Sequence, residues 1–208
     1  MLLQSYVHGS STTKLLGETL GVNFDSAVER WGDREALVVM HQNIRWTYKD
    51  LKERVDAFAA GLLSLGLEPG DRIGIWSQNN SEWIVTQYAT AKAGLILVNI
   101  NPAYRVSELE YAINKVGCKA LILSESFKSS DYVAMVKELA PEVEKSDPGR
   151  LESTRLPSLR SIIQIGGNIA AGFFDFAEIP SLASAGDHER LQELETELQF
   201  DDPINIQF

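Results

Sequence analysis

The chain has 208 residues, 44% of them hydrophobic and 23% charged, which is ordinary for a globular protein. Its 29 acidic residues outnumber its 19 basic residues and give a formal net charge of -10. Proteins that bind nucleic acid or anionic lipid usually carry a basic surface, so this charge argues against both classes. Cys118 is the only cysteine, which excludes an intrachain disulfide. No apolar run approaches the roughly 20 residues that a membrane-spanning helix needs.

The opening segment is small and polar, and we predict that residues 1–21 form a flexible N-terminal arm. This segment has neither the apolar centre of a secretory signal nor the arginines of a mitochondrial presequence, so no presequence is visible. Apolar residues then recur at helical spacing, which predicts a helix over about 24–31 with Asn23 as its N-cap. Two apolar runs flank the residues 41–43, and this arrangement predicts a hairpin.

A long helix is predicted from Thr47 onwards. Thr47 followed three residues later by Asp50 has the pattern of a capping box. Apolar residues along the helix repeat every three or four positions, as in a helix with one face in a core. Gly66 follows as the expected left-handed residue that ends it.

Short apolar strands alternate with amphipathic helices in the rest of the chain. Strands are predicted at about 72–76, 95–98, 120–123, 161–165 and 203–208. Helices are predicted at about 81–93 with Ser81 as cap, 107–116, 132–139 and 189–198. The polar stretch 141–157 is predicted to be a surface excursion. The alternation predicts an α/β fold made of βαβ units, with a mostly parallel sheet and helices on both faces.

Histidine and cysteine do not form the clusters that metal sites require. His8, His41 and His188 lie far apart in the sequence, so structural or solvated roles are favoured. Ser11 and Lys14 match a Ser-x-x-Lys pattern, but they lie in the polar arm without its companion motifs. We therefore predict no nucleophile there.

Three further patterns have simpler structural explanations. An acidic cluster is explained more simply as a solvated helix face than as paired catalytic carboxylates; it consists of Asp25, Glu29, Asp33 and Glu35. Asn79-Asn80-Ser81 matches a glycosylation sequon, but helix capping by Ser81 accounts for it. Gly166-Gly167 is not followed by Lys-Ser or Lys-Thr, so it is no Walker-type phosphate loop.

Five stretches of the sequence together resemble a known family. They are Trp46–Leu51, Gly66–Ile75, Asn79–Trp83, Ala91–Arg105 and Asp201–Phe208. In this order and spacing they resemble the AMP-forming acyl-adenylate synthetases, and the resemblance covers about 24–208. Within that superfamily, the sequences around 116–121, 140–144 and 202–208 resemble the mitochondrial medium-chain acyl-CoA synthetases.

The resemblance implies an enzyme that activates a medium-chain fatty acid with ATP and Mg²⁺ and then transfers it to coenzyme A in the mitochondrial matrix. It also implies that a phosphate-binding loop directly follows the strand at 204–208. Residues 22–208 would then be the N-terminal portion of the AMP-binding domain, truncated before that loop. On this basis we expect no catalytic, cofactor-binding or metal-binding residue in this chain, and no cofactor or activity for this chain alone.

Tyr104 and Arg105 are the nearest to candidate site residues. They lie on a predicted loop beyond the end of a strand, where α/β sheets place ligands, although a plain surface role is favoured. The alternative to a part of an enzyme is a short non-enzymatic product that acts as a binding or regulatory partner. An open sheet edge at 204–208 would favour self-association.

Overall fold

The computed structural model describes residues 12–13 and 15–208. Residues 1–11 and 14 of the predicted arm lie outside the described residues. Helix α1 (Leu20–Trp31) begins four residues before the predicted start. The cap is Thr19 and not Asn23, because the Thr19 hydroxyl accepts a hydrogen bond from the backbone N–H of Val22 at 3.2 Å.

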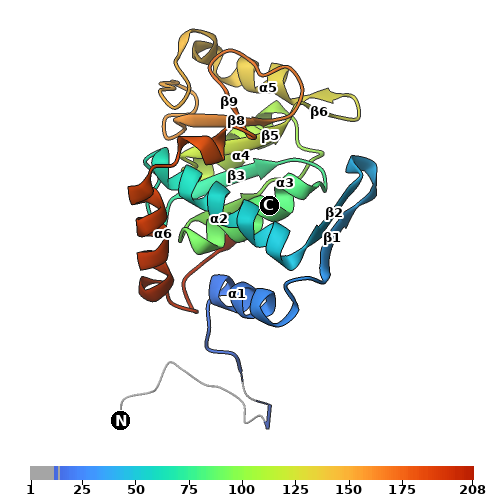
Figure 1. The fold of residues 1–208 in the computed structure, drawn as a ribbon. Helices are drawn as coiled ribbons and strands as arrows, with labels where there is room; N and C mark the ends of the chain where they lie inside the picture. The colour runs from blue at the N-terminus through green and yellow to red at the C-terminus, as the bar shows by residue number, and fades with distance from the viewer. Residues whose placement is uncertain (1–11, 14) are drawn as a thin grey trace, which may run out of the picture.

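Six parallel strands form the central sheet in the order β10-β4-β3-β5-β8-β9 (Figure 1). The strands are β3 (Arg72–Trp76), β4 (Ile96–Asn99), β5 (Ala120–Ser124), β8 (Ser161–Ile165), β9 (Phe174–Asp175) and β10 (Asn205–Gln207). After β3 the chain adds β4 on one side and β5 on the other, so the strand order reverses at β3. The predicted α/β class with a parallel sheet is confirmed.

Helices cover both faces of this sheet. The first face carries α1, α2 (Tyr48–Ser64), α3 (Ser81–Lys92) and α6 (Ala185–Glu197), and the second carries α4 (Val106–Val116) and α5 (Tyr132–Leu139). Strand β5 contributes Ala120 and Ile122 to the first core, whereas Leu121 and Leu123 enter the second. This alternation is what a strand covered on both sides requires.

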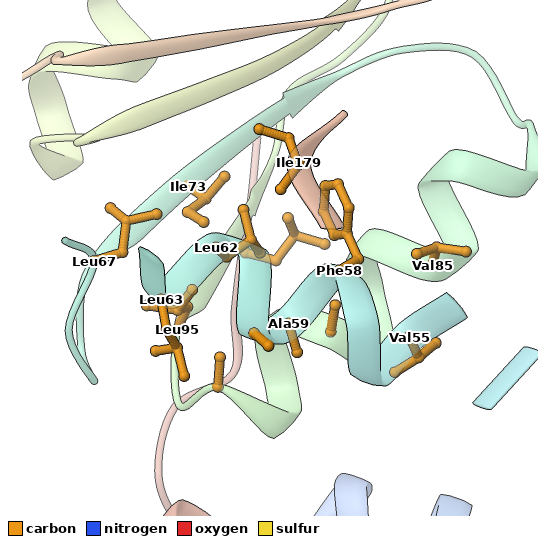
Figure 2. Packing of buried hydrophobic residues seen from close by; sticks show 14 of the residues in the cluster. Val55, Phe58, Ala59, Leu62, Leu63, Leu67, Ile73, Val85, Leu95 and Ile179 are labelled. Carbon is orange, nitrogen blue, oxygen red and sulfur yellow. The ribbon is translucent and has the colours of Figure 1, made fainter. Parts of the chain in front are cut away.

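Helix α2 is the centre of the first core. Its predicted capping box is confirmed, since Thr47 accepts from the backbone of Asp50 and the Asp50 carboxylate accepts from the backbone of Thr47. Figure 2 shows Phe58 and Leu62 of this helix directed at Ile179 and at strand β3. Ile179 begins the 3-10 helix η3 (Ile179–Leu182), which lies against α2.

Two small antiparallel hairpins lie outside the main sheet. The predicted hairpin is confirmed as β1 (Glu35–Val39) and β2 (Ile44–Thr47), joined by the 3-10 helix η1 (Met40–Gln42). Asn43 completes the turn with φ of 53°. A second hairpin, β6 (Ser126–Phe127) and β7 (Ser130–Asp131), was not predicted, because two-residue strands leave no periodic pattern.

Three sequence predictions are corrected by the structure. The cap of α3 is Asn80 and not Ser81, because Asn80 Oδ1 accepts from the N–H of Trp83 at 2.8 Å. Helix α6 starts four residues earlier than predicted, at a capping box formed by Ser184 and Asp187. The polar stretch 141–157 is not only a surface excursion. It contains the 3-10 helix η2 (Pro141–Lys145), and its apolar side chains Val143, Leu151 and Leu156 are buried in the second core.

Candidate functional site

The carboxyl edge of the sheet, where the strand order reverses, is the expected place for a ligand in an α/β fold. There Ser77 follows β3 and Ser124 ends β5, and their hydroxyl oxygens lie 2.7 Å apart. Asn80 Nδ2 donates to Ser77 Oγ at 3.0 Å, and Ser77 Oγ donates to the carbonyl of Gln78 at 2.9 Å. The three side chains are buried, so they close this part of the edge with a satisfied polar network.

The loop after β4 is held by two aromatic side chains. The rings of Trp76 and Tyr132 stack with centroids 3.6 Å apart. Trp76 Nε1 donates to the carbonyl of Asn101 at 3.1 Å, and the Tyr132 hydroxyl donates to the carbonyl of Pro102 at 2.5 Å. A tyrosine hydroxyl is protonated at neutral pH and can donate, and burial raises the pKa of Tyr132 further, to about 12.

This loop carries the two candidate residues Tyr104 and Arg105. Tyr104 is half-buried against the second core, so most of its ring has a packing role. Arg105 is exposed, and its guanidinium donates to Ser130 Oγ at 2.7 Å. The structure therefore brings Arg105 to the β6–β7 hairpin at the carboxyl edge. Nothing in these contacts assigns either residue a ligand.

Two side-chain oxygens at the same edge are buried without a hydrogen-bond partner among the described residues. They are Oε1 of Gln78, in the loop after β3, and Oδ1 of Asn99, at the end of β4. A buried acceptor left unpaired costs about 1–3 kcal/mol. Sequence reasoning missed both residues, because only the tertiary fold shows which amides lack a partner.

Strand β10 brings its own carboxyl end to this edge. It runs parallel to β4, with Gln207 in register with Asn99, and the N–H of Phe208 donates to the carbonyl of Asn99 at 3.1 Å. The ends of β3, β4, β5 and β10 thus meet at one edge of the sheet.

The other candidate residues from the sequence do not assemble into a site where the structure describes them. His41 and His188 are exposed on different elements, and His8 and the pair Ser11 and Lys14 lie outside the described residues. Among residues 12–13 and 15–208, no three His, Cys, Asp or Glu side chains group as metal ligands would. Burial raises the pKa of the Cys118 thiol to about 12, which makes it inert as a nucleophile.

Members of the acidic cluster bind different cations. Asp33 pairs with Lys49, and Glu35 pairs with Arg45, both at the surface.

Glycines 166 and 167 have φ of 64° and 73°, as a tight loop requires. In the sequon pattern Asn79 is exposed, whereas Ser81 is buried in the first turn of α3.

Asp25 belongs to a partly buried group of four charges that joins α1, α2 and α3. Lys92 Nζ lies 2.9 Å from Asp25 and also contacts Asp56, and Lys52 contacts the same two carboxylates. Burial alone would lower the pKa of Lys52, but its hydrogen bonds to both carboxylates raise it. Although the group lines a hollow of about 590 Å³, its charges neutralise one another, which indicates a structural role.

The chain belongs to the family of AMP-binding enzymes, whose model matches residues 24–208. Its relatives are acyl-CoA ligases. The chain is 46% identical over 205 residues to the mitochondrial medium-chain acyl-CoA ligase ACSF2 of Macaca fascicularis, covering 98% of this chain and 33% of the relative. It is 34% identical over 195 residues to the putative acyl-CoA synthetase YngI of Bacillus subtilis, covering 94% and 36%.

Solved structures show the same fold. The putative long-chain fatty acid CoA ligase of Rhodopseudomonas palustris matches with a TM-score of 0.64 and 26% identity over 81% of this chain and 37% of its own. The anthranilate CoA ligase AuaEII, solved with anthranoyl-AMP, matches in fold with a TM-score of 0.67 and 18% identity over 82% and 29%. The chain spans about a third of the length of its curated relatives and corresponds to their N-terminal part.

Among the described residues, no helix combines the length and the apolar character that a membrane crossing requires.

Proposed function

We propose that the whole protein is an acyl-CoA ligase that activates a medium-chain fatty acid, and that residues 22–208 supply the N-terminal portion of its AMP-binding domain. The observation that carries this proposal is the 46% identity to a medium-chain acyl-CoA ligase over 98% of the chain. The parallel sheet supports it, because four strand ends meet at the edge where α/β folds bind ligands.

The reaction has two steps. A carboxylate oxygen of the fatty acid attacks the α-phosphorus of ATP, a new oxygen–phosphorus bond forms, and pyrophosphate leaves. The sulfur of coenzyme A then attacks the acyl carbon, the thiol proton is released, and AMP leaves with the oxygen that joined it to the acyl group. Both steps need donors and cations arranged around phosphate charge.

We propose that the described residues shape the edge and that those groups come from elsewhere in the whole protein. The unpaired oxygens of Gln78 and Asn99 are acceptors, and an acceptor does not bind a phosphate oxygen. Mg²⁺ in nucleotide enzymes is held by one or two carboxylates together with the phosphates, and we propose that those carboxylates also lie outside the described residues. We assign the phosphate contacts to the part of the relatives' length that this chain does not span.

The role proposed for this part is to hold the carboxyl edge in shape. Trp76 and Tyr132 fix the loop at 101–104, and Arg105 ties it to the β6–β7 hairpin. The Ser77–Ser124 contact fixes the ends of β3 and β5. The ACSF2 relatives are named mitochondrial, which supports a mitochondrial location for the whole protein, and we propose the matrix as its compartment.

We propose in addition that this chain alone self-associates through β10. This strand pairs with β4 on one side and with no other described strand on the second side, and Ile204 beside it is 37% exposed. The alternative function, a short non-enzymatic partner protein, is not favoured, because the relatives matched across 98% of the chain are named as ligases.

The test is pyrophosphate exchange into ATP by the full-length protein with octanoate as substrate. We expect exchange that depends on octanoate, and none from the 208-residue chain under the same conditions. Absence of exchange by the full-length protein with carboxylic acids of any chain length would overturn the proposed activity. Exchange by the 208-residue chain would show that the phosphate contacts lie within it.

A further inference from the structure

A second hollow on the first face of the sheet shares no lining residue with the group of four charges. It encloses about 430 Å³ between β2, α2, the start of α3 and the segment that joins β9 to η3. Pockets that hold small molecules in proteins usually enclose about 300–1,000 Å³. The hollow is therefore large enough for a small-molecule ligand.

The inner wall of this hollow is apolar and well packed. Phe58 is 1% exposed, and its ring stacks on the ring of Phe176 with centroids 4.1 Å apart. Val85 of α3 is buried in the same core and also lines the hollow. An apolar group placed against these side chains would be removed from water, which favours a ligand with an apolar body.

The hollow is lined by one cationic side chain, that of Arg54 on α2. Its guanidinium carbon lies 4.3 Å from the centroid of the Trp46 ring, which lines the hollow too. Arginine stacks on aromatic faces in this way while its planar N–H groups stay available for carboxylates. Arg54 forms no hydrogen bond and no salt bridge with any described residue, so its donors are free for a ligand.

Two carboxylates also line the hollow, and neither forms a salt bridge with Arg54. Glu82 Oε2 accepts from Gln42 Nε2 at 2.8 Å and from the hydroxyl of Ser81 at 3.0 Å. Glu53 is exposed and makes no ion pair among the described residues. Glu82 thus has its donors already, whereas Arg54 lacks an acceptor, and the group that the hollow leaves without a partner calls for an anion.

We propose that this hollow binds a small amphiphilic carboxylate of the fatty-acid kind, with its carboxylate on Arg54 and its apolar body against Phe58, Val85 and Phe176. A guanidinium binds a carboxylate through two parallel hydrogen bonds, which fixes the head group as well as attracting it. The inference does not rest on the proposed ligase activity, because it uses only the hollow and its arginine. The C-terminus of a peptide has the same head group, and the experiment separates the two ligands.

The experiment labels the full-length protein with an octanoate analogue that carries a photoreactive diazirine at its far end. Mass spectrometry of the proteolytic peptides then locates the label. We expect saturable labelling of the peptides that contain Phe58, Val85 or Phe176, and loss of this labelling in excess octanoate. The analogue with an alcohol in place of the carboxylate should label these peptides at least about fivefold less, because it lacks the charged acceptor for Arg54.

Variants of two exposed arginines show whether the head group is recognised. Arg54→Gln should reduce the labelling by at least about fivefold with an unchanged Tm, and Arg54→Lys, which keeps the charge without the planar fork, should retain part of it. Arg45→Gln is the matched control, because Arg45 on β2 is exposed, pairs with Glu35 and does not line the hollow. It should label as the wild type does.

Absence of label from these peptides in the wild type overturns the inference, and so does equal labelling by the acid and the alcohol. Labelling of Arg54→Gln at the wild-type level would also overturn it. Displacement of the label by a short peptide with a free apolar C-terminus, but not by octanoate, would overturn the fatty-acid assignment in favour of a peptide. Only these peptides are compared, so failure of pyrophosphate exchange would refute the proposed function and leave this result to stand by itself.

Discussion

The hydroxyl oxygens of Ser77 and Ser124 lie 2.7 Å apart and join the carboxyl ends of β3 and β5, although 47 residues separate them in the chain. Ser77 also accepts from Asn80, so its hydroxyl is the centre of the network. The contact fixes the point at which the strand order reverses.

Replacing Ser77 by Ala should therefore cost more stability than replacing Ser124 by Ala. Loss of the Ser77 hydroxyl leaves both Asn80 Nδ2 and the Ser124 hydroxyl without this partner, so Ser77→Ala should lower the free energy of unfolding by about 2–3 kcal/mol. Ser124→Ala should lower it by about 1 kcal/mol. The double variant should cost less than the sum, because the two residues share one hydrogen bond. Denaturant unfolding of the three variants measures this, and strict additivity would show that the hydroxyls do not interact.

Lys92 should contribute far more to stability than an exposed lysine in a comparable ion pair. Its side chain is 9% exposed and contacts both Asp25 and Asp56, so Lys92→Met should cost about 3 kcal/mol. Lys49 is the control, because its pair with Asp33 is solvated and Lys49→Met should cost under about 0.5 kcal/mol. Equal unfolding free energies for the two variants would mean that the buried charges do not hold α1 in place.

Two glycines in helices should respond in opposite directions to alanine. A Cβ at Gly61 would lie 2.3 Å from the carbonyl oxygen of Ile179, so Gly61→Ala should destabilise the protein by about 2 kcal/mol or more despite its better helix propensity. At Gly186 the nearest atom would be 3.6 Å away, and Gly186→Ala should stabilise by about 0.5 kcal/mol. Thermal melts compare the two directly. A gain in Tm for Gly61→Ala would show that η3 does not pack on α2 as described.

Cys118 should be protected from thiol reagents in the folded protein. Burial raises its pKa to about 12 from an ordinary value of 9.0, so at pH 8 the native thiol should react at least about a hundredfold more slowly than the unfolded one. Between about pH 9 and pH 12 the folded thiol keeps its proton, whereas the unfolded thiol loses it. Its contribution to stability is therefore complete below about pH 9 and is lost as the pH rises towards 12.

The variant Cys118→Val should remove that part of the pH dependence and abolish labelling. Labelling of the wild type at the rate of the unfolded chain in native buffer would contradict the buried position.

The sequence predicted the regular elements well where a local signal marked them. The bounds of β3 and β8 agree with the structure, and the Thr47–Asp50 capping box marks the start of α2 as expected. Errors occurred at the starts of α1, α3 and α6, and at α3 two capping residues are adjacent. Asn80 caps α3 although Ser81 has the same propensity. Asn80 Oδ1 accepts from the N–H of Trp83, and the N–H of Ser81 donates to Gln42, a tertiary contact that no local pattern shows.

The carboxyl edge was less accessible to sequence reasoning. Its position follows from the βαβ pattern, and Tyr104 and Arg105 were placed on it correctly as loop residues after β4. The contact between Ser77 and Ser124 depends on the register of two parallel strands, which no local pattern specifies. The Oδ1 atom of Asn99 is unpaired because no donor among the described residues lies within hydrogen-bonding distance, and this depends on the packing of the whole fold.

The measurement that tests the central claim most directly is hydrogen–deuterium exchange of the full-length protein with and without a non-hydrolysable octanoyl-AMP analogue. If the carboxyl edge of this sheet faces the reaction, protection should appear in residues 99–105 and in the residues after Phe208. The turns at the opposite edge, 66–71 and 117–119, should exchange as before. Protection of those turns, with none at the carboxyl edge, would contradict the account.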